Sequence, residues 1–189
     1  QGEGVRAGVP HCFVRFTGCN LRCSADDQES GFDCDTEFNS GSPMTANEII
    51  EEIKRISDGC QNVCLTGGEP TLQMDAELIS ALRKEEFWLA LETNGTKQVP
   101  LEWFDWIAVS PKSADHTIRQ RICCEVKYVR NAGQAIPRTP IKADHYLISP
   151  AFAPDGSIDP ATLRHCINLV KLNPQWRLSV QQHKLWKIR

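Results

Sequence analysis

The chain has 189 residues, a length that fits one domain with one sizeable core. Its 21 basic and 24 acidic side chains give a net charge of −3, which argues against nucleic acid or an anionic membrane as the main partner. No apolar run approaches the roughly 18 residues of a membrane span, and no signal peptide is visible, so we expect a cytoplasmic protein. Because the sequence does not begin with methionine, we expect further residues upstream of Gln1.

Short apolar segments alternate with helical patterns along the chain, which predicts β-α-β units and a parallel sheet. Thr45 and Glu48 form a capping box at the start of the first expected helix. Asp75 caps the second, and the third covers residues 161–172. We expect Ile49, Ile50, Ile53 and Ile56 to lie on one face of the first helix, and Leu78, Ile79 and Leu82 to point inward from the second. The expected strands cover residues 11–16, 62–66, 88–92, 106–110, 124–129, 146–149 and 177–181.

Polar or glycine-rich residues follow several of these strands. Examples are Thr66 to Pro70 after the second strand and Glu92 to Gly95 after the third. The carboxyl ends of parallel strands carry the active site in α/β barrels, so we expect the functional residues at that edge. Residues 20–42 show no periodicity and are expected to form a long loop, a feature that is often functional.

Nine cysteines are the unusual feature of the composition. The number is odd and nothing indicates secretion, so a pure disulfide framework is disfavoured, and a metal or cluster site with a few structural thiols is expected. Cys12 and Cys64 lie in expected strands and are predicted to be buried. The neighbouring pair Cys123 and Cys124 is predicted to serve packing.

Three of the cysteines, Cys19, Cys23 and Cys34, lie on the loop after the first strand. Three thiolates can hold three corners of an iron–sulfur cluster and leave one iron open, since cluster iron is normally bound by cysteine. A zinc site is the alternative, and it would need a fourth ligand such as His11 or Cys12. The spacing alone leaves both possibilities open.

Further motifs resemble those of a known superfamily. The cysteine loop is similar to the cluster loop of radical S-adenosylmethionine enzymes, usually CxxxCxxC, and Thr66-Gly67-Gly68-Glu69-Pro70 looks like their glycine-rich motif. Within that superfamily, four segments resemble the 7-carboxy-7-deazaguanine synthase family. They are Gln1-Gly2-Glu3-Gly4, Glu92-Thr93-Asn94-Gly95, Val109-Ser110-Pro111-Lys112 and the stretch from Trp176 to Lys184.

The resemblance implies a partial, shortened (β/α) barrel that forms a single domain over residues 1–189. It implies a lyase of queuosine biosynthesis that converts 6-carboxy-5,6,7,8-tetrahydropterin to 7-carboxy-7-deazaguanine with loss of ammonia. The implied cofactors are a 4Fe–4S cluster, S-adenosylmethionine and Mg²⁺. The implied partners are a flavodoxin-like or ferredoxin-like electron donor and a second copy of the chain.

The resemblance also assigns roles to residues. Because the radical arises on the cofactor, no side chain is expected to be catalytic. Cys19, Cys23 and Cys34 are the cluster ligands and Thr36 the magnesium ligand. The expected contacts to S-adenosylmethionine are Gly68, Glu69, Glu92, Asn94, Ser110, Pro111, Lys112 and, by position only, Ser149, Pro150, Ala151 and Phe152. The expected substrate contacts are Gln1, Gly2, Glu3, Arg15, Thr66, His183 and Arg189.

The sequence departs from the superfamily pattern in one place. Ten residues separate Cys23 from Cys34 where two are usual, and this insertion is acidic. An activase that makes a glycyl radical on a partner protein is an alternative within the superfamily, although the two terminal motifs argue against it. A non-catalytic zinc module is the alternative from another class, and it gives no reason for Thr66 to Pro70.

Overall fold

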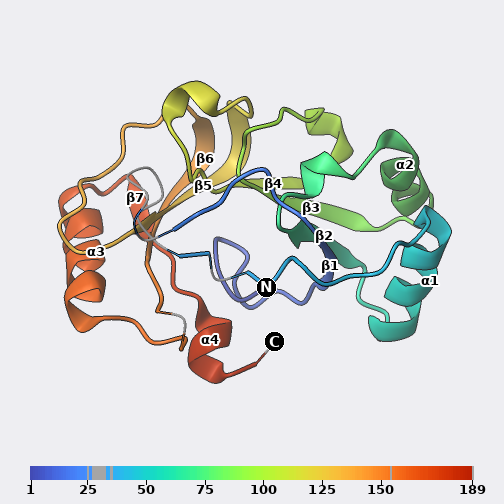
Figure 1. Ribbon diagram of the computed structural model, residues 1–189, viewed down its shortest axis with the longest axis horizontal. Helices are drawn as coiled ribbons and strands as arrows, with labels where there is room; N and C mark the ends of the chain where they lie inside the picture. Colours follow the sequence, from blue (N-terminus) through green and yellow to red (C-terminus); the bar gives the residue numbers. More distant parts are fainter. Residues whose placement is uncertain (25, 27–32, 35, 154, 189) are drawn as a thin grey trace.

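The computed structural model describes residues 1–24, 26, 33–34, 36–153 and 155–188. These residues form one sheet of seven parallel strands, arranged in the order of the sequence from β1 to β7 (Figure 1). Each β-α-β or β-loop-β connection therefore leads to the neighbouring strand, as alternating strand and helix patterns predict. The strands are β1 (Cys12–Phe16), β2 (Asn62–Gly67), β3 (Trp88–Thr93), β4 (Trp106–Val109), β5 (Ile122–Arg130), β6 (Lys142–Pro150) and β7 (Trp176–Leu178).

The sheet is curved and open. Within the described residues β1 pairs only with β2 and β7 only with β6, so the two edge strands do not close a barrel. The helices lie outside the arc, with α1 (Ala46–Ile56) and α2 (Ala76–Lys84) beside β1 to β3 and α3 (Pro160–Leu172) beside β6 and β7 (Figure 1). This is the partial (β/α) barrel that was expected.

The helices begin where the sequence predicts. Thr45 accepts a hydrogen bond from the backbone of Glu48, and the Glu48 side chain accepts one from the backbone of Thr45, so the capping box of α1 is complete. Ile50 and Ile53 are buried beneath the helix. Ile56, the last residue of α1, is 49% exposed.

The sheet separates a hydrophobic core from a polar inner face. The core under the helices is built on fully buried strand residues such as Leu65, Leu89 and Val126. Cys12 and Cys64 are buried, as predicted, and so is Cys123.

A row of side chains crosses the inner face of five neighbouring strands. Arg15 pairs in register with Thr66, which donates a hydrogen bond to Glu92, and Glu92 pairs with Ala108, which pairs with Glu125. Since strand residues alternate between the two faces, this row places Arg15, Glu92 and Glu125 on the inner face, opposite the apolar core.

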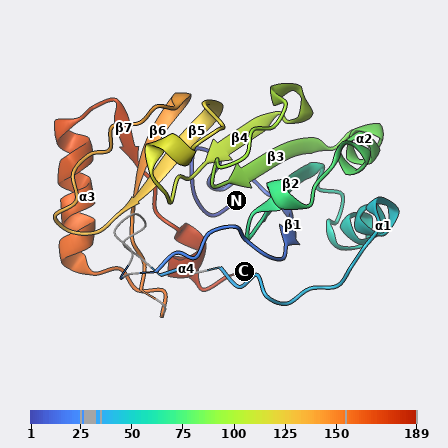
Figure 2. The same ribbon diagram turned by 45° about the horizontal axis from the view of Figure 1, so that its top comes forward.

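Two features of the fold differ from the expectation at the carboxyl end. The last strand is shorter than predicted, and the chain then forms a helix, α4 (Gln182–Trp186), that was not expected. The amino terminus lies inside the arc of the sheet and α4 lies near its opening (Figure 2). No helix in the described part of the chain is long and apolar enough to span a membrane.

Candidate active site

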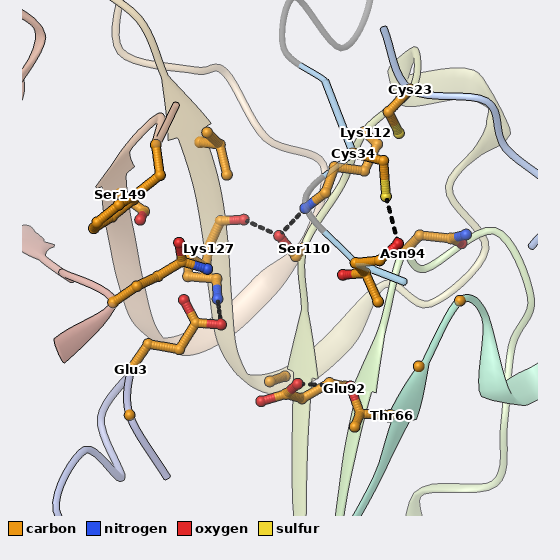
Figure 3. Close-up of a pocket in the computed structure, with 18 of the residues that line it drawn as sticks. Glu3, Cys23, Cys34, Thr66, Glu92, Asn94, Ser110, Lys112, Lys127 and Ser149 are labelled. Carbon is orange, nitrogen blue, oxygen red and sulfur yellow. Dashed lines mark hydrogen bonds and ion pairs between the residues drawn. The ribbon is translucent and has the colours of Figure 1, made fainter. Parts of the chain in front are cut away.

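The concave side of the sheet holds a cavity of about 680 Å³. Its lining comes from the loops after β1 to β4, from β5 and β6, and from both ends of the chain (Figure 3). The cavity therefore lies at the carboxyl ends of the strands, where an α/β sheet of this kind binds ligands. The lining includes three cysteines, several carboxylates and four basic side chains.

The three cysteines of the long loop face this cavity together. Cys19 and Cys23 are half-buried, and Cys34 is exposed. Cys19 Sγ accepts weak hydrogen bonds from the backbone of Leu21 at 3.4 Å and from Asn94 Nδ2 at 4.0 Å. Hydrogen bonds to the ligand sulfurs are a usual feature of iron–sulfur sites, so the surroundings of Cys19 suit a cluster ligand.

Neither a disulfide nor a ready-made metal site is present among the described residues. The nine cysteines all lie in the described part of the chain and form no disulfide. Among the described residues, no group of three or more His, Cys, Asp or Glu side chains is arranged around a single metal ion. The acidic insertion between Cys23 and Cys34 lies outside the described residues except for Ser24, Asp26 and Asp33.

The glycine-rich motif packs directly on the start of the cysteine loop. Gly67 has a positive φ of 123°, and a Cβ on Gly68 would clash with the carbonyl oxygen of Gly18. The backbone N–H of Glu69 donates to that same carbonyl at 2.9 Å. Only glycines allow this approach, so the motif fixes the loop next to Cys19.

Two expected contacts to S-adenosylmethionine, Glu69 and Pro111, are buried and lie outside the lining of the cavity. Glu69 instead accepts hydrogen bonds from Thr71, from the Thr93 hydroxyl and from the backbone of Asn94 at 2.7 Å. It thereby ties the glycine-rich loop to the end of β3. Of the other residues expected to contact this cofactor, Gly68, Glu92, Asn94, Ser110, Lys112, Ser149, Pro150, Ala151 and Phe152 line the cavity.

Glu92 lies among the residues expected to bind substrate. Its carboxylate accepts hydrogen bonds from Gln1 Nε2 at 2.5 Å and from the Thr66 hydroxyl at 2.8 Å. These three side chains join the amino terminus, β2 and β3 across the floor of the cavity (Figure 3 labels Thr66 and Glu92).

The two ends of the chain meet at the cavity. The ring of His183 packs against Gly2, and the backbone N–H of Gln182 donates to the Gly2 carbonyl at 2.8 Å. The backbone N–H of Gly4 donates to Ser179 Oγ at 3.0 Å. Further along, the Arg6 guanidinium stacks 3.8 Å from the ring centre of Trp88, which fastens the amino-terminal segment below the cavity.

The remaining expected residues are placed as follows. Thr36 lines the cavity beside the cysteine loop, and Arg15 lines it from an exposed position on β1. The ammonium of Lys112 donates to the Ser110 hydroxyl. Phe152 lies under the ammonium of Lys184, 4.9 Å from the ring centre. Arg189 lies outside the described residues.

Two charged residues of β5 that the sequence analysis did not select also face the cavity. Lys127 Nζ lies 2.6 Å from Glu3 Oε1, and Glu125 accepts a hydrogen bond from the backbone of Val5. Burial raises the pKa of Glu125, which is 5% exposed. The signal in the sequence was the alternation of Glu125 and Lys127 with the apolar Val126 and Tyr128, which places the charges on one face.

An open parallel sheet with a three-cysteine loop and a glycine-rich turn at its carboxyl edge defines a radical S-adenosylmethionine enzyme. The sequence pattern of the radical SAM superfamily matches residues 13–132. That superfamily implies a 4Fe–4S cluster and S-adenosylmethionine as cofactors, and the cysteines and glycines described above suit them.

Comparison with individual proteins narrows the class. The chain is 36% identical to 7-carboxy-7-deazaguanine synthase of Bacteroides thetaiotaomicron, over 100% of this chain and 93% of the relative. It is 37% identical to the protein of that name from Bradyrhizobium diazoefficiens, over 100% and 94%. The crystal structure of QueE from Escherichia coli has the same fold, with a TM-score of 0.65, 24% identity and coverage of 97% of this chain and 90% of that one. The chain belongs to the 7-carboxy-7-deazaguanine synthase family, and neither the activase nor the zinc module is favoured.

Proposed function

We propose that the protein converts 6-carboxy-5,6,7,8-tetrahydropterin to 7-carboxy-7-deazaguanine, with contraction of the reduced ring and loss of ammonia. The observation that supports this most directly is the composition of one cavity. The cysteines and the glycine-rich turn lie at one part of its lining, and Gln1, Glu3, Arg15 and His183 contribute to the same lining. A radical generated beside the cysteines would therefore arise in the same space as a molecule held by these polar side chains.

When bound, the cluster and S-adenosylmethionine together supply a carbon-centred radical that removes a hydrogen atom from the substrate. The chain supplies the surroundings. Cys19, Cys23 and Cys34 hold the cluster, and Asn94 donates to the Cys19 sulfur. Gly68 lines the cavity next to the cysteine loop, and its backbone is the expected contact for the amino-acid part of S-adenosylmethionine.

Side chains at the other part of the lining orient the substrate. The Arg15 guanidinium suits the carboxylate of the pterin, because its planar fork can donate two parallel hydrogen bonds. Glu3 suits the amide and amino groups of the pterin ring, which are donors. The Glu92 carboxylate, which accepts hydrogen bonds from Gln1 and Thr66, forms the floor on which the pterin ring would rest.

Mg²⁺ completes the proposal. We assign its protein ligand to the Thr36 hydroxyl, which lies beside the cysteines and faces the cavity. Magnesium favours oxygen ligands and retains several waters, so one hydroxyl together with the substrate carboxylate suits it. We also propose that the protein works in the cytoplasm as a homodimer of single-domain subunits, reduced by a flavodoxin-like or ferredoxin-like donor.

The test is turnover of anaerobically reconstituted protein with the pterin, S-adenosylmethionine, Mg²⁺ and a reductant. We expect cluster absorbance near ~400 nm, about four irons per chain, and formation of the deazaguanine with ammonia. Protein that carries the cluster and cleaves S-adenosylmethionine but leaves the pterin unchanged would contradict the proposed reaction while preserving the superfamily assignment.

A further inference from the structure

Lys127 and Glu3 form a buried ion pair in the wall of the cavity. Lys127 Nζ lies 2.6 Å from Glu3 Oε1, and the side chains are 13% and 14% exposed (Figure 3). Glu3 comes from the amino-terminal segment and Lys127 from the inner face of β5, so two distant parts of the chain build the pair. Removing two charges from water is costly, so this pair is weak evidence for a stabilising role.

The ammonium has hydrogen-bonding capacity left over. Among the residues that the structure describes, Glu3 is the one side chain bonded to Lys127 Nζ. An ammonium carries three N–H donors, so two of them remain for a molecule in the cavity. Burial alone lowers the pKa of Lys127, but Glu3, Glu92 and Glu125 raise it to a net value above the usual one, so the group stays charged.

The other basic side chains of the lining are placed differently. Lys112 donates to the Ser110 hydroxyl, Lys184 lies over Phe152, and Arg15 is exposed. Lys127 lies directly beside the Glu3 carboxylate. A carboxylate and an ammonium side by side offer an acceptor next to a donor.

That arrangement is the complement of one edge of a pterin ring. On this edge the 2-amino group and N3–H are donors, and the 4-oxo group next to them is an acceptor. Building on the proposed function, we propose that Glu3 and Lys127 together recognise this edge. Glu3 accepts from N3–H and the 2-amino group, and Lys127 donates to the 4-oxo oxygen.

Lys127 is then a specificity-determining residue. A 4-amino pteridine presents a donor where Lys127 also donates, and its N3 is an acceptor facing Glu3. A site built to hydrogen-bond a group discriminates strongly against an analogue that lacks it, because the buried donors are left without a partner. The protein should therefore select 4-oxo over 4-amino pteridines.

Equilibrium binding tests this without turnover. The probes are 6-carboxypterin and 2,4-diamino-6-carboxypteridine, added anaerobically to cluster-loaded protein with S-adenosylmethionine. We expect wild type to bind 6-carboxypterin more tightly. Lys127→Met should weaken that binding about tenfold to hundredfold, as loss of a hydrogen bond from a charged group does, and should leave the affinity for the diamino compound within about twofold. Lys127→Arg, which keeps charged donors, should retain the preference.

The controls separate recognition from folding. Iron content and the thermal midpoint identify variants that remain intact. If Lys127→Met does not fold, Lys127→Gln supplies a neutral donor on a side chain one atom shorter, and it should weaken 6-carboxypterin binding alone, by a smaller factor.

Different results would reject the role of Lys127 alone or the proposed function as well. Equal weakening of both compounds would overturn the proposal, because Lys127 would then act on the shared carboxylate or merely hold Glu3. Unchanged binding of 6-carboxypterin would overturn it as well. Wild-type protein that carries its cluster but binds neither compound would reject the proposed function together with this inference.

Discussion

The imidazole of His183 lies directly against the α-carbon of Gly2, with no space for a side chain at that position. Next to this contact, the Gly2 carbonyl accepts the hydrogen bond from Gln182. The two terminal motifs are thus parts of one wall of the cavity. Gly2 is needed because the ring of His183 occupies the place of a Cβ.

Gly2→Ala should therefore displace His183 and impair substrate binding. Overpacking of this kind costs about 1–3 kcal/mol, so KM for the pterin should rise about fivefold to 150-fold if the cost falls on binding. Steady-state kinetics on cluster-loaded protein measures this. In a His183→Gly background the ring and the Cβ of residue 183 are both absent, and Gly2→Ala should add little. An equal penalty in both backgrounds would show that the contact with His183 is not the cause.

Cys19→Ala and Cys34→Ala should each abolish cluster assembly. Iron should fall from about four atoms per chain to near zero after anaerobic reconstitution, because three thiolates are the minimum that leaves a single open iron. Cys60→Ala is the matched control, since Cys60 lies outside the cavity lining and bonds the Pro10 carbonyl instead. Full iron content in Cys34→Ala would remove that residue from the ligand set.

Thr36→Ala should keep the cluster but weaken the stimulation of turnover by magnesium. Losing one of the few protein oxygens should raise the magnesium concentration for half-maximal rate by about tenfold, without changing iron content. Thr36→Ser restores the hydroxyl and should restore the magnesium response. Identical magnesium titrations of wild type and Thr36→Ala would mean that the hydroxyl serves only the local turn.

Cys123 should resist alkylation in the folded protein. Burial raises its thiol pKa to about 12, so only ~1 in 10,000 molecules carries the reactive thiolate at pH 8. Raising the pH toward this pKa should increase the thiolate fraction about tenfold per unit. Mass spectrometry after brief iodoacetamide treatment should find Cys123 unmodified with or without the cluster.

Cys34 provides the comparison within the same sample. It is exposed, and it should be labelled in cluster-free protein and protected once the cluster is assembled. Rapid labelling of Cys123 in native protein would contradict the packing role predicted for the Cys123–Cys124 pair.

Much of the fold was predictable because short buried strands and capped helices leave strong local patterns. Residues 62–66 were expected as a strand and β2 covers Asn62–Gly67, while Thr45 and Asp75 cap the helices as predicted. The helix α4 could not be predicted, because five residues are too few to show a helical period. Lys127 was missed because which face of a strand points inward depends on the register and curvature of the whole sheet.

The hydrogen bond between Gly2 and Gln182 also affects the order in which the protein folds during synthesis. The ribosome releases the amino end first, so Gly2 has no partner until all seven strands of the sheet and α3 have been made. Contacts between residues so distant in sequence form late and slowly in folding. The sheet can thus be assembled while the cavity still lacks a wall, and the nascent chain has no complete pterin site before residue 182 leaves the ribosome.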